Sequence, residues 1–138
     1  MRVHTTELRV RYAETDKMGV AHHSSYLLWF ELARTGLLRE AGFPYRDLEA
    51  GGCMLPVIEY GCRLLRGAAY DDLVRIDTVV SELRSRTVAF RYRARRDGVL
   101  LVEGFTRHAC IDPGNTLCSV PADVRAAIAA YRERTGDQ

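Results

Sequence analysis

The stretch that decides the fold is ETDKMGVAHHSSYLLWFELARTGLLREAG, residues 14–42, in which a polar loop runs directly into a long apolar segment. Apolar side chains recur in that segment at steps of three and four residues, at Tyr26, Phe30, Ala33, Leu37 and Ala41. That period predicts an α-helix. Further apolar residues occupy most of the remaining circumference, so we expect a helix that is buried on nearly every side.

Both ends of this predicted helix carry signals in the sequence. Ser24 or Ser25 is expected to cap its start, because a serine hydroxyl can accept hydrogen bonds from the free N–H groups of the first turn. Gly42 can take the left-handed conformation that follows a helix, and Pro44 cannot continue one. The helix is therefore predicted to begin at these serines and to end before Gly42.

Length and composition are those of one globular domain. A chain of 138 residues is expected to form a single domain over residues 1–138, and its hydrophobic content of 47% and charged content of 28% are ordinary for such a domain. No apolar run reaches the roughly 18 residues of a membrane span, and the N-terminus lacks the apolar region of a signal peptide. We therefore expect a cytoplasmic protein without membrane insertion.

Nearly all of the basic residues are arginines. The net charge of +2 gives no general attraction to nucleic acid, so no nucleic-acid partner is expected. Lys17 is the only lysine among 20 basic residues, and six arginines are crowded between positions 84 and 96. Either the genome favours arginine codons, or this segment contacts a phosphorylated ligand, whose oxygens suit the arginine fork.

Apolar-rich or alternating segments outside the helix predict five β-strands, at residues 6–12, 53–66, 73–83, 87–95 and 99–111. Pro56 and Gly61 make the second of these a bulged or edge strand. Residues 43–51 are expected to form a short irregular or single-turn connection, Asp97-Gly98 is typical of a hairpin turn, and Pro121 is expected to open a C-terminal helix.

Together these elements predict an α+β architecture. A helix that is apolar on nearly every side needs cover on nearly every side, and a strongly curved antiparallel sheet wrapped around it supplies most of that cover. A single curved sheet still leaves one edge and one face open to water. We therefore expect a second copy of the chain to cover the rest.

Residues 12–34, YAETDKMGVAHHSSYLLWFELAR, resemble the signature of the hotdog-fold acyl-CoA thioesterases of the 4-hydroxybenzoyl-CoA thioesterase family. Eight positions match that signature, namely Asp16, Gly19, Val20, His23, Tyr26, Trp29, Phe30 and Glu31. The resemblance continues at residues 68–78 and 108–113, with spacings most similar to the branch of Tol-Pal-associated bacterial thioesterases. It implies a hotdog fold, hydrolysis of an acyl-CoA thioester, and a homodimer or a homotetramer built from dimers.

The resemblance also implies roles for single residues. The backbone N–H at His23 would polarise the thioester carbonyl, and the carboxylate of Asp16 would act as nucleophile or as general base for water. A helix N-terminus suits the first task, since it offers free N–H groups and the positive end of the helix dipole. The predicted substrate-binding residues are Gly19, Val20, His22, Tyr26 and Glu31, with Arg84, Arg86 and Arg107 as candidates for the phosphates of coenzyme A.

Glu31 leaves two interpretations open. A carboxylate on an apolar, buried helix must be paired, so Glu31 either forms a structural ion pair or hydrogen bond, or orients water or substrate. Three aromatic residues leave a similar choice between core and pocket, with the core as the favoured interpretation, namely Tyr26, Trp29 and Phe30. No cofactor is expected, because coenzyme A is itself part of the substrate.

Other site chemistries are weakly supported. A metal site of Asp16, His22, His23 and Glu31 is disfavoured, because adjacent histidines point in different directions and no second histidine pair at ligand spacing exists. The four cysteines, Cys53, Cys62, Cys110 and Cys118, show no CxxC spacing, so reduced thiols in the core or at a sheet edge are expected.

Two alternatives to a thioesterase remain open. The chain lacks Walker, GxGxxG and GxSxG motifs, which disfavours nucleotide hydrolysis, dinucleotide redox chemistry and the serine-hydrolase route. A hydratase or dehydratase of the same fold would use a different placement of His and Asp or Glu. A non-catalytic acyl-CoA-binding protein or envelope-associated scaffold would bind the same ligand without turnover.

Overall fold

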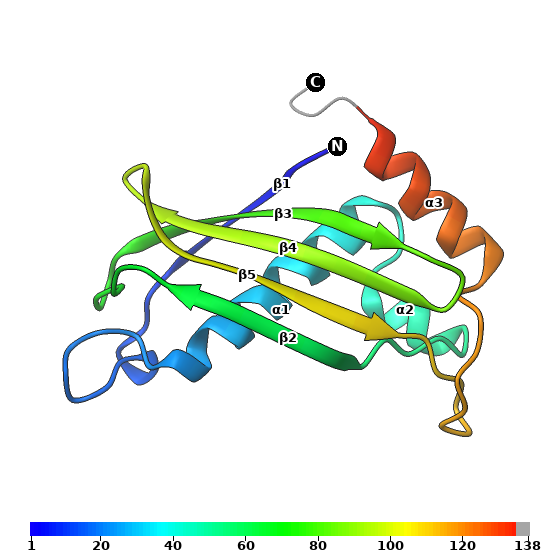
Figure 1. Ribbon diagram of the computed structural model, residues 1–138, viewed down its shortest axis with the longest axis horizontal. Coiled ribbons are helices and arrows are strands. Elements are labelled where there is room, and N and C mark those ends of the chain that lie inside the picture. Colours follow the sequence, from blue (N-terminus) through cyan, green and yellow to red (C-terminus); the bar gives the residue numbers. More distant parts are fainter. Residues whose placement is uncertain (135–138) are drawn as a thin grey trace.

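A computed structural model describes residues 1–134 and shows one long helix lying against a five-stranded antiparallel sheet (Figure 1). The strand order is β1-β3-β4-β5-β2, with bounds β1 (His4–Arg9), β2 (Val57–Leu64), β3 (Leu73–Leu83), β4 (Thr87–Arg96) and β5 (Val99–Ala109). The helices are α1 (His23–Glu40), α2 (Tyr45–Ala50) and α3 (Ala122–Glu133). The predicted α+β architecture, with an antiparallel sheet around a central helix, is confirmed.

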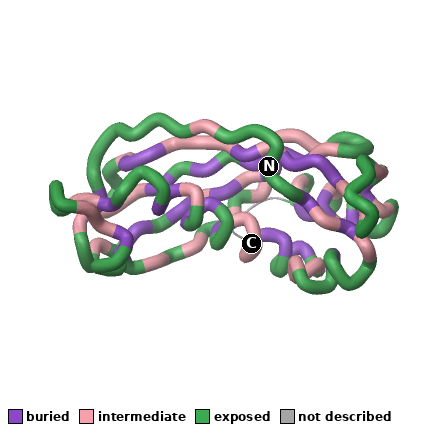
Figure 2. The backbone as a smooth tube through the Cα atoms, turned by 90° about the horizontal axis from the view of Figure 1, so that it is seen from below, coloured by how far each residue is buried: buried purple, intermediate pink, exposed green. Residues whose placement is uncertain are grey.

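The strand pattern in the sequence places one face of the sheet on α1. Buried positions alternate with more exposed ones along β3, where Val74, Ile76, Thr78 and Val80 are buried. Figure 2 shows buried stretches in the interior of the molecule and exposed ones around it, and the edge strand β2 is exposed along most of its length. Phe30 of α1 stacks on Tyr92 of β4 with ring centroids 4.3 Å apart. Gly104 of β5 admits this contact, because a Cβ there would lie 2.8 Å from the Phe30 ring.

Strand β2 lies at one edge of the sheet and pairs only with β5. Its register shifts between Val57 and Glu59, so the prediction of a bulged or edge strand is confirmed on both counts. At the other edge, β1 begins and ends earlier than residues 6–12. The difference arises because Glu14 N–H donates to the Arg11 carbonyl (2.9 Å), which turns Tyr12–Glu14 into a 3₁₀ helix.

The start of α1 differs from the prediction. His22 is the N-cap, and its ring Nδ1 accepts a hydrogen bond from Ser24 N–H (3.2 Å), so the helix begins at His23 and both serines lie inside it. The predicted serine cap is therefore wrong. The predicted end is confirmed, because Gly42 has φ +104° and Phe43 N–H donates to the Leu38 carbonyl (2.9 Å).

The prediction that α1 is buried on nearly every side is wrong for one stripe of the helix. Leu28 and Leu32 are 59% and 52% exposed, although Phe30, Ala33 and Leu37 are buried. The sheet covers only one side of α1, and within a single chain nothing in residues 1–134 covers the stripe of Leu28 and Leu32.

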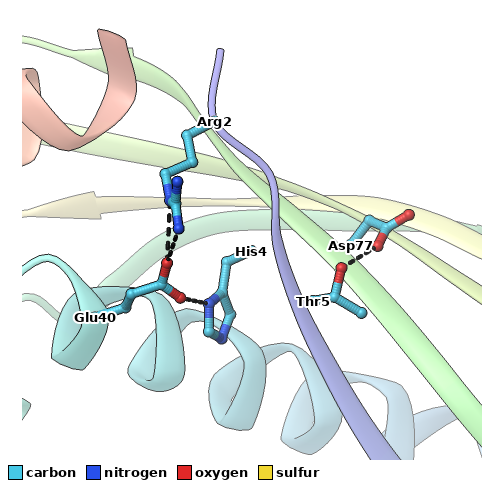
Figure 3. Close-up of polar contacts among 5 residues, drawn as sticks. All are labelled: Arg2, His4, Thr5, Glu40 and Asp77. Carbon is cyan, nitrogen blue, oxygen red and sulfur yellow. Dashed lines mark hydrogen bonds and ion pairs between the residues drawn. The ribbon is translucent and has the colours of Figure 1, made fainter. Parts of the chain in front are cut away.

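The C-terminal end of α1 is tied to β1 and its flank by charged side chains (Figure 3). Arg2 donates through Nε to Glu40 Oε1 (3.0 Å), and His4 Nδ1 lies 2.6 Å from Glu40 Oε2. Beside them, Thr5 Oγ1 donates to Asp77 of β3 (2.8 Å). These contacts connect β1 to the helix on one side and to the sheet on the other.

All four cysteines are free thiols, as the sequence predicts. Cys53 and Cys110 are buried, with sulfur atoms 3.3 Å apart, and Cys62 is exposed on the edge strand β2. Burial raises the pKa of the Cys110 thiol to about 11, so that thiol stays protonated at neutral pH.

Candidate active site

The polar loop before α1 closes on itself as a tight turn that presents Asp16. Asp16 N–H donates to the Val20 carbonyl (2.9 Å), and Gly19 N–H donates to the Asp16 carbonyl (2.9 Å). Gly19 has φ +84°, a conformation that glycine adopts without strain. The half-buried Asp16 accepts a hydrogen bond from Met18 N–H at Oδ1 (2.8 Å), and within residues 1–134 its Oδ2 has no hydrogen-bond partner.

The first turn of α1 leaves one backbone donor unused. His22 N–H donates to the Glu14 carbonyl (2.8 Å), Ser24 N–H to the ring of His22, and Ser25 N–H to the His22 carbonyl (2.8 Å). Among the described residues, the N–H of His23 donates to nothing. Because it lies at the positive end of the helix dipole, this N–H is a ready donor to a carbonyl oxygen or an anion.

Tyr26 links the Asp16 loop to the edge strand. Its side chain is only 2% exposed, and burial raises the pKa of its phenol. The end of β2 lies at the same end of the sheet as the loop before α1 (Figure 1), and negative charge on Asp16 or Cys62 would raise the pKa of Tyr26 further. The end of β2 that carries Cys62 therefore borders the site.

A second loop, residues 66–72, supports the Asp16 loop from the side. Ala21 N–H donates to the Ala68 carbonyl (2.7 Å), and Gly67 lies so close to Val20 that a Cβ there would be 2.6 Å from Val20 Cγ1. Asp72 holds this second loop by accepting from Ala69 N–H (2.8 Å) and from Arg96 (2.7 Å). These bonds lower the pKa of Asp72, so its carboxylate stays ionised.

Glu14 lies behind the site and was missed as a site residue in the sequence. Its side chain is 9% exposed, and its carboxylate accepts hydrogen bonds from Arg11 N–H (2.7 Å) and from the indole N–H of Trp29 (3.0 Å). A signal was available, since a buried tryptophan N–H needs an acceptor and an acidic residue stands two positions before Asp16.

The chain is similar to known proteins along most of its length. Residues 10–128 match the model of the thioesterase-like superfamily. The chain belongs to the thioesterase-like superfamily. It is 34% identical over 122 residues to the protein named acyl-CoA thioesterase YbgC of Haemophilus influenzae, covering 87% of this chain and 90% of that protein.

Solved structures agree with the family assignment. A hypothetical protein, TT1821, from Thermus thermophilus superimposes with a TM-score of 0.90 at 44% identity, over 93% of this chain and 98% of that one. The DHNA-CoA thioesterase of Staphylococcus aureus superimposes with a TM-score of 0.93 at 28% identity, over 99% of both chains. The fold of this thioesterase-like protein is therefore the hotdog fold that the resemblance implied.

The structure of this thioesterase-like protein brings most of the predicted motif residues together at the start of α1, namely Asp16, Gly19, Val20, His22, His23 and Tyr26. Glu31 lies apart from them, more than two turns along the helix. Its side chain is 65% exposed, 3.8 Å from Arg34, so the expectation of a buried carboxylate at Glu31 is wrong for the single chain. It occupies the uncovered stripe with Leu28 and Leu32.

The predicted phosphate-binding arginines lie elsewhere in the chain. Arg84 and Arg86 belong to the β3–β4 turn and Arg107 to the end of β5, at the opposite end of the sheet from the Asp16 loop (Figure 1). Arg84 pairs with Glu82 (2.9 Å), and Arg107 donates to Glu59 (3.2 Å). One chain therefore does not bring these arginines to Asp16.

The histidine pair shows no arrangement for metal binding. The rings of His22 and His23 lie 4.0 Å apart, and Nδ1 of His22 is engaged with Ser24. In residues 1–134, no group of three or more His, Cys, Asp or Glu side chains is placed to hold a metal ion. The same part of the chain contains no helix that is long and apolar enough to cross a bilayer.

Proposed function

We propose that the chain is an acyl-CoA thioesterase that hydrolyses its substrate to a free acid and coenzyme A at the start of α1. The observation that carries this proposal is the unused N–H of His23 on a helix start that is joined to the Asp16 loop. The names of the relatives, an acyl-CoA thioesterase and a DHNA-CoA thioesterase, support the same reaction class.

The chemistry follows from these two groups. The thioester carbonyl oxygen accepts a hydrogen bond from the His23 N–H, which together with the helix dipole stabilises the negative charge that develops on that oxygen. The free Oδ2 of Asp16 either attacks the acyl carbon or takes a proton from the attacking water. Where Asp16 acts as base, the attacking water supplies the hydroxyl of the new acid, the C–S bond breaks, and the proton taken by Asp16 passes to the leaving sulfur. Where Asp16 attacks, the C–S bond breaks to leave a mixed anhydride on Asp16. Water then hydrolyses this anhydride to the free acid and the Asp16 carboxylate, and a proton from water completes the coenzyme A thiol.

A second copy of the chain completes this proposal. The free edge of β2 carries unpaired backbone groups and exposed apolar side chains, including Ile58 (53% exposed) and Tyr60 (59%). The stripe of Leu28 and Leu32 on α1 is also exposed. An isologous dimer in which two β2 strands pair would bury both surfaces and remove the edge. Light scattering should give at least the mass of a dimer, and a stable monomer would contradict it.

The dimer also gives the predicted arginines a role. Because β2 would pair antiparallel with its copy, the start of one β2 strand would lie beside the end of the other. Arg107 pairs with Glu59 near the start of β2, and Cys62 near its end borders the site. Arg84, Arg86 and Arg107 of one copy would then lie toward Asp16 of the other, where they would bind the phosphates of coenzyme A.

The remaining expectations extend the same proposal. The enzyme would need no metal and no bound cofactor, and it would work in the cytoplasm, where acyl-CoA is available. Its assignment to the Tol-Pal-associated branch stays a prediction. A screen of short, long and aromatic acyl-CoAs, with release of free thiol as the signal, would identify the acyl group.

The direct test is the Asp16→Asn variant. We expect it to lower kcat/KM for the best acyl-CoA by about 10²- to 10⁴-fold, because a carboxamide neither attacks a thioester nor accepts the proton of water. The matched control is Asp97→Asn in the exposed β4–β5 turn, where φ is +50° and asparagine is well accommodated. That control should keep parental activity.

Three outcomes would overturn the proposal. Full activity of Asp16→Asn would remove Asp16 from the chemistry. Calorimetric binding of acyl-CoA without any turnover by the parent chain would favour the scaffold alternative. Hydration of a 2-enoyl-CoA by the parent chain, in place of thiol release, would favour a hydratase.

A further inference from the structure

We infer that Glu14 is the positioning residue of the site, a buried carboxylate that fixes the Asp16 loop against the first turns of α1. The inference deepens the proposed function and depends on it, because it concerns how Asp16 is held relative to the His23 N–H. Glu14 itself touches neither group.

The carboxylate of Glu14 joins two segments of chain. One oxygen, Oε1, accepts from Arg11 N–H (2.7 Å), at the point where the chain leaves β1. The other, Oε2, accepts from the indole N–H of Trp29 (3.0 Å), in the second turn of α1, and from the Arg11 guanidinium (3.3 Å). Glu14 therefore connects the entry of the Asp16 loop to the helix that follows it.

The backbone of Glu14 makes the same connection a second time. Its carbonyl accepts from His22 N–H (2.8 Å) and from the Ser25 hydroxyl (3.0 Å). His22 is the residue directly before the free N–H of His23. Asp16 stands only two residues after Glu14 in the chain. Glu14 therefore fixes Asp16 through the backbone and fixes the start of α1, next to the His23 donor, through hydrogen bonds.

Only a carboxylate satisfies the pocket around the Glu14 side chain. Both of its oxygens face N–H donors, so a carboxamide would point its own NH₂ group at a donor whichever way it turned. Burial would raise the pKa of Glu14, but the hydrogen bonds from Arg11 and Trp29 lower it overall and keep the group ionised. Glu14→Gln is therefore a disruptive change despite its equal size.

The expected consequence is a misplaced Asp16 rather than a lost binding site. A displacement of a reacting group by about 1 Å from its productive position lowers the rate by about 10²-fold. We expect Glu14→Gln to lower kcat by about 10- to 100-fold while KM changes less than about twofold, because the Glu14 carboxylate and its partners, Arg11 and Trp29, are not among the groups proposed to bind the acyl-CoA.

A double-mutant cycle separates positioning from general structural damage. In the Asp16→Asn background there is no carboxylate left to position, so Glu14→Gln should cause no more than about a twofold further loss. If Glu14 only stabilised the fold, its loss of activity would be the same in both backgrounds. The matched control is Glu40→Gln at the other end of α1, which should leave kcat within about twofold.

A second variant serves if Glu14→Gln does not fold. Trp29→Phe removes one donor to Glu14 and keeps an aromatic side chain in place. It should lower kcat by about 3- to 10-fold in the parent chain and have no effect in the Asp16→Asn background. Parental kcat in both Glu14→Gln and Trp29→Phe, or losses that multiply with Asp16→Asn, would overturn the inference. An active Asp16→Asn variant would instead refute the proposed function.

Discussion

The two ends of α1 differ in how their backbone groups are hydrogen-bonded. At the end of the helix, Gly42 and Phe43 supply N–H groups to the last carbonyls, and Glu40 is held by Arg2 and His4. At its start the N–H of His23 has no acceptor in the described chain, and the side chains of His22 and His23 are exposed. One end is complete within the chain, and the other is complete only with a ligand.

The helix dipole sharpens this difference. Negative charge is favourable at a helix start and unfavourable at its end. Glu40 stands at the unfavourable end and is stabilised by two basic side chains (Figure 3). Asp16 and Glu14 stand near the favourable end, where an incoming oxygen can use the same field. The end of α1 thus serves stability, and under the proposed function its start serves chemistry.

The largest predicted effect comes from removing the free N–H at the start of α1. His23 is the first helical residue, where proline fits, and His22 has φ −64° and ψ 143°, the conformation that a residue before proline prefers. His23→Pro should therefore keep the helix and remove the free N–H, together with the imidazole. We expect kcat to fall by about 10²- to 10³-fold, as for the loss of one oxyanion donor.

The matched variant for this test is His23→Ala, which removes the imidazole and keeps the N–H. It should retain kcat within a few-fold, and far-UV circular dichroism should show equal helix content in both variants. If the alanine variant lost as much activity as the proline variant, the imidazole would be the active group and the open N–H would have no role in the reaction.

A buried polar chain in the sheet lies beneath the middle of α1, where the ring of Phe30 on the helix stacks on Tyr92 of β4. His108 is 1% exposed, and its Nδ1 lies 2.8 Å from the Leu55 carbonyl, which can only accept. Its Nε2 must then accept from Thr106 (2.8 Å), which accepts in turn from Tyr92 (2.6 Å), beside Arg34 of α1.

The buried, neutral imidazole of His108 makes the stability of the protein sensitive to acid. Burial, aided by the charge of Arg34, lowers the pKa of His108 from 6.5 to about 4. The unfolded chain therefore binds the extra proton first, and stability is lost as the pH falls from 6.5 toward 4. We expect the free energy of unfolding to drop by about 2 kcal/mol between pH 7.5 and pH 5 from this group alone.

Urea unfolding at fixed protein concentration, repeated from pH 7.5 to pH 5, measures this effect. His108→Gln should remove most of the pH dependence in that range, whereas His23→Ala, which alters an exposed histidine, should retain it. A parental slope in His108→Gln would show that groups other than His108 carry the dependence.

Periodicity predicted the elements of this fold well, because it reports which side of an element is buried. The alternation in residues 73–83 matches β3, and Asp97-Gly98 forms the predicted hairpin turn, between β4 and β5, with φ +50° and +78°. The exposed stripe of α1 was misjudged for the same reason. An apolar side chain at Leu28 predicts burial, but nothing in residues 1–134 covers it, and only the proposed dimer would bury it.

The site was predictable where one motif contains it and unpredictable where contacts are long-range. Asp16 and His23 are close in sequence, and the helix start joins them. The indole of Trp29 on Glu14 and the packing of Gly67 on Val20 depend on the folded backbone, which no local pattern records. The serine cap failed because the ring of His22 accepts from the Ser24 N–H, so that the helix begins at His23, before either serine.

The smallest predicted effect is the loss of stability in Glu40→Gln, which should depend on salt, whereas the loss in Glu14→Gln should not. Burial would raise the pKa of Glu40, but hydrogen bonds from Arg2 and His4 lower it overall, so its contribution is present above its unfolded pKa of 4.5 and lost as the pH falls. At 34% side-chain exposure, Glu40→Gln should cost about 1 kcal/mol at low salt and pH 7, with kcat unchanged.

That loss should shrink to nearly nothing in 1 M sodium chloride, because the screening length falls from about 10 Å at 0.1 M to about 3 Å and the Glu40 pair faces water. The loss in Glu14→Gln should persist at the same salt concentration, since Glu14 is 9% exposed and its main donors are a backbone N–H and an indole N–H. Equal salt dependence of the two variants would mean that both ends are held by surface charge, and the start of α1 would then lack the buried support that the positioning of Asp16 requires.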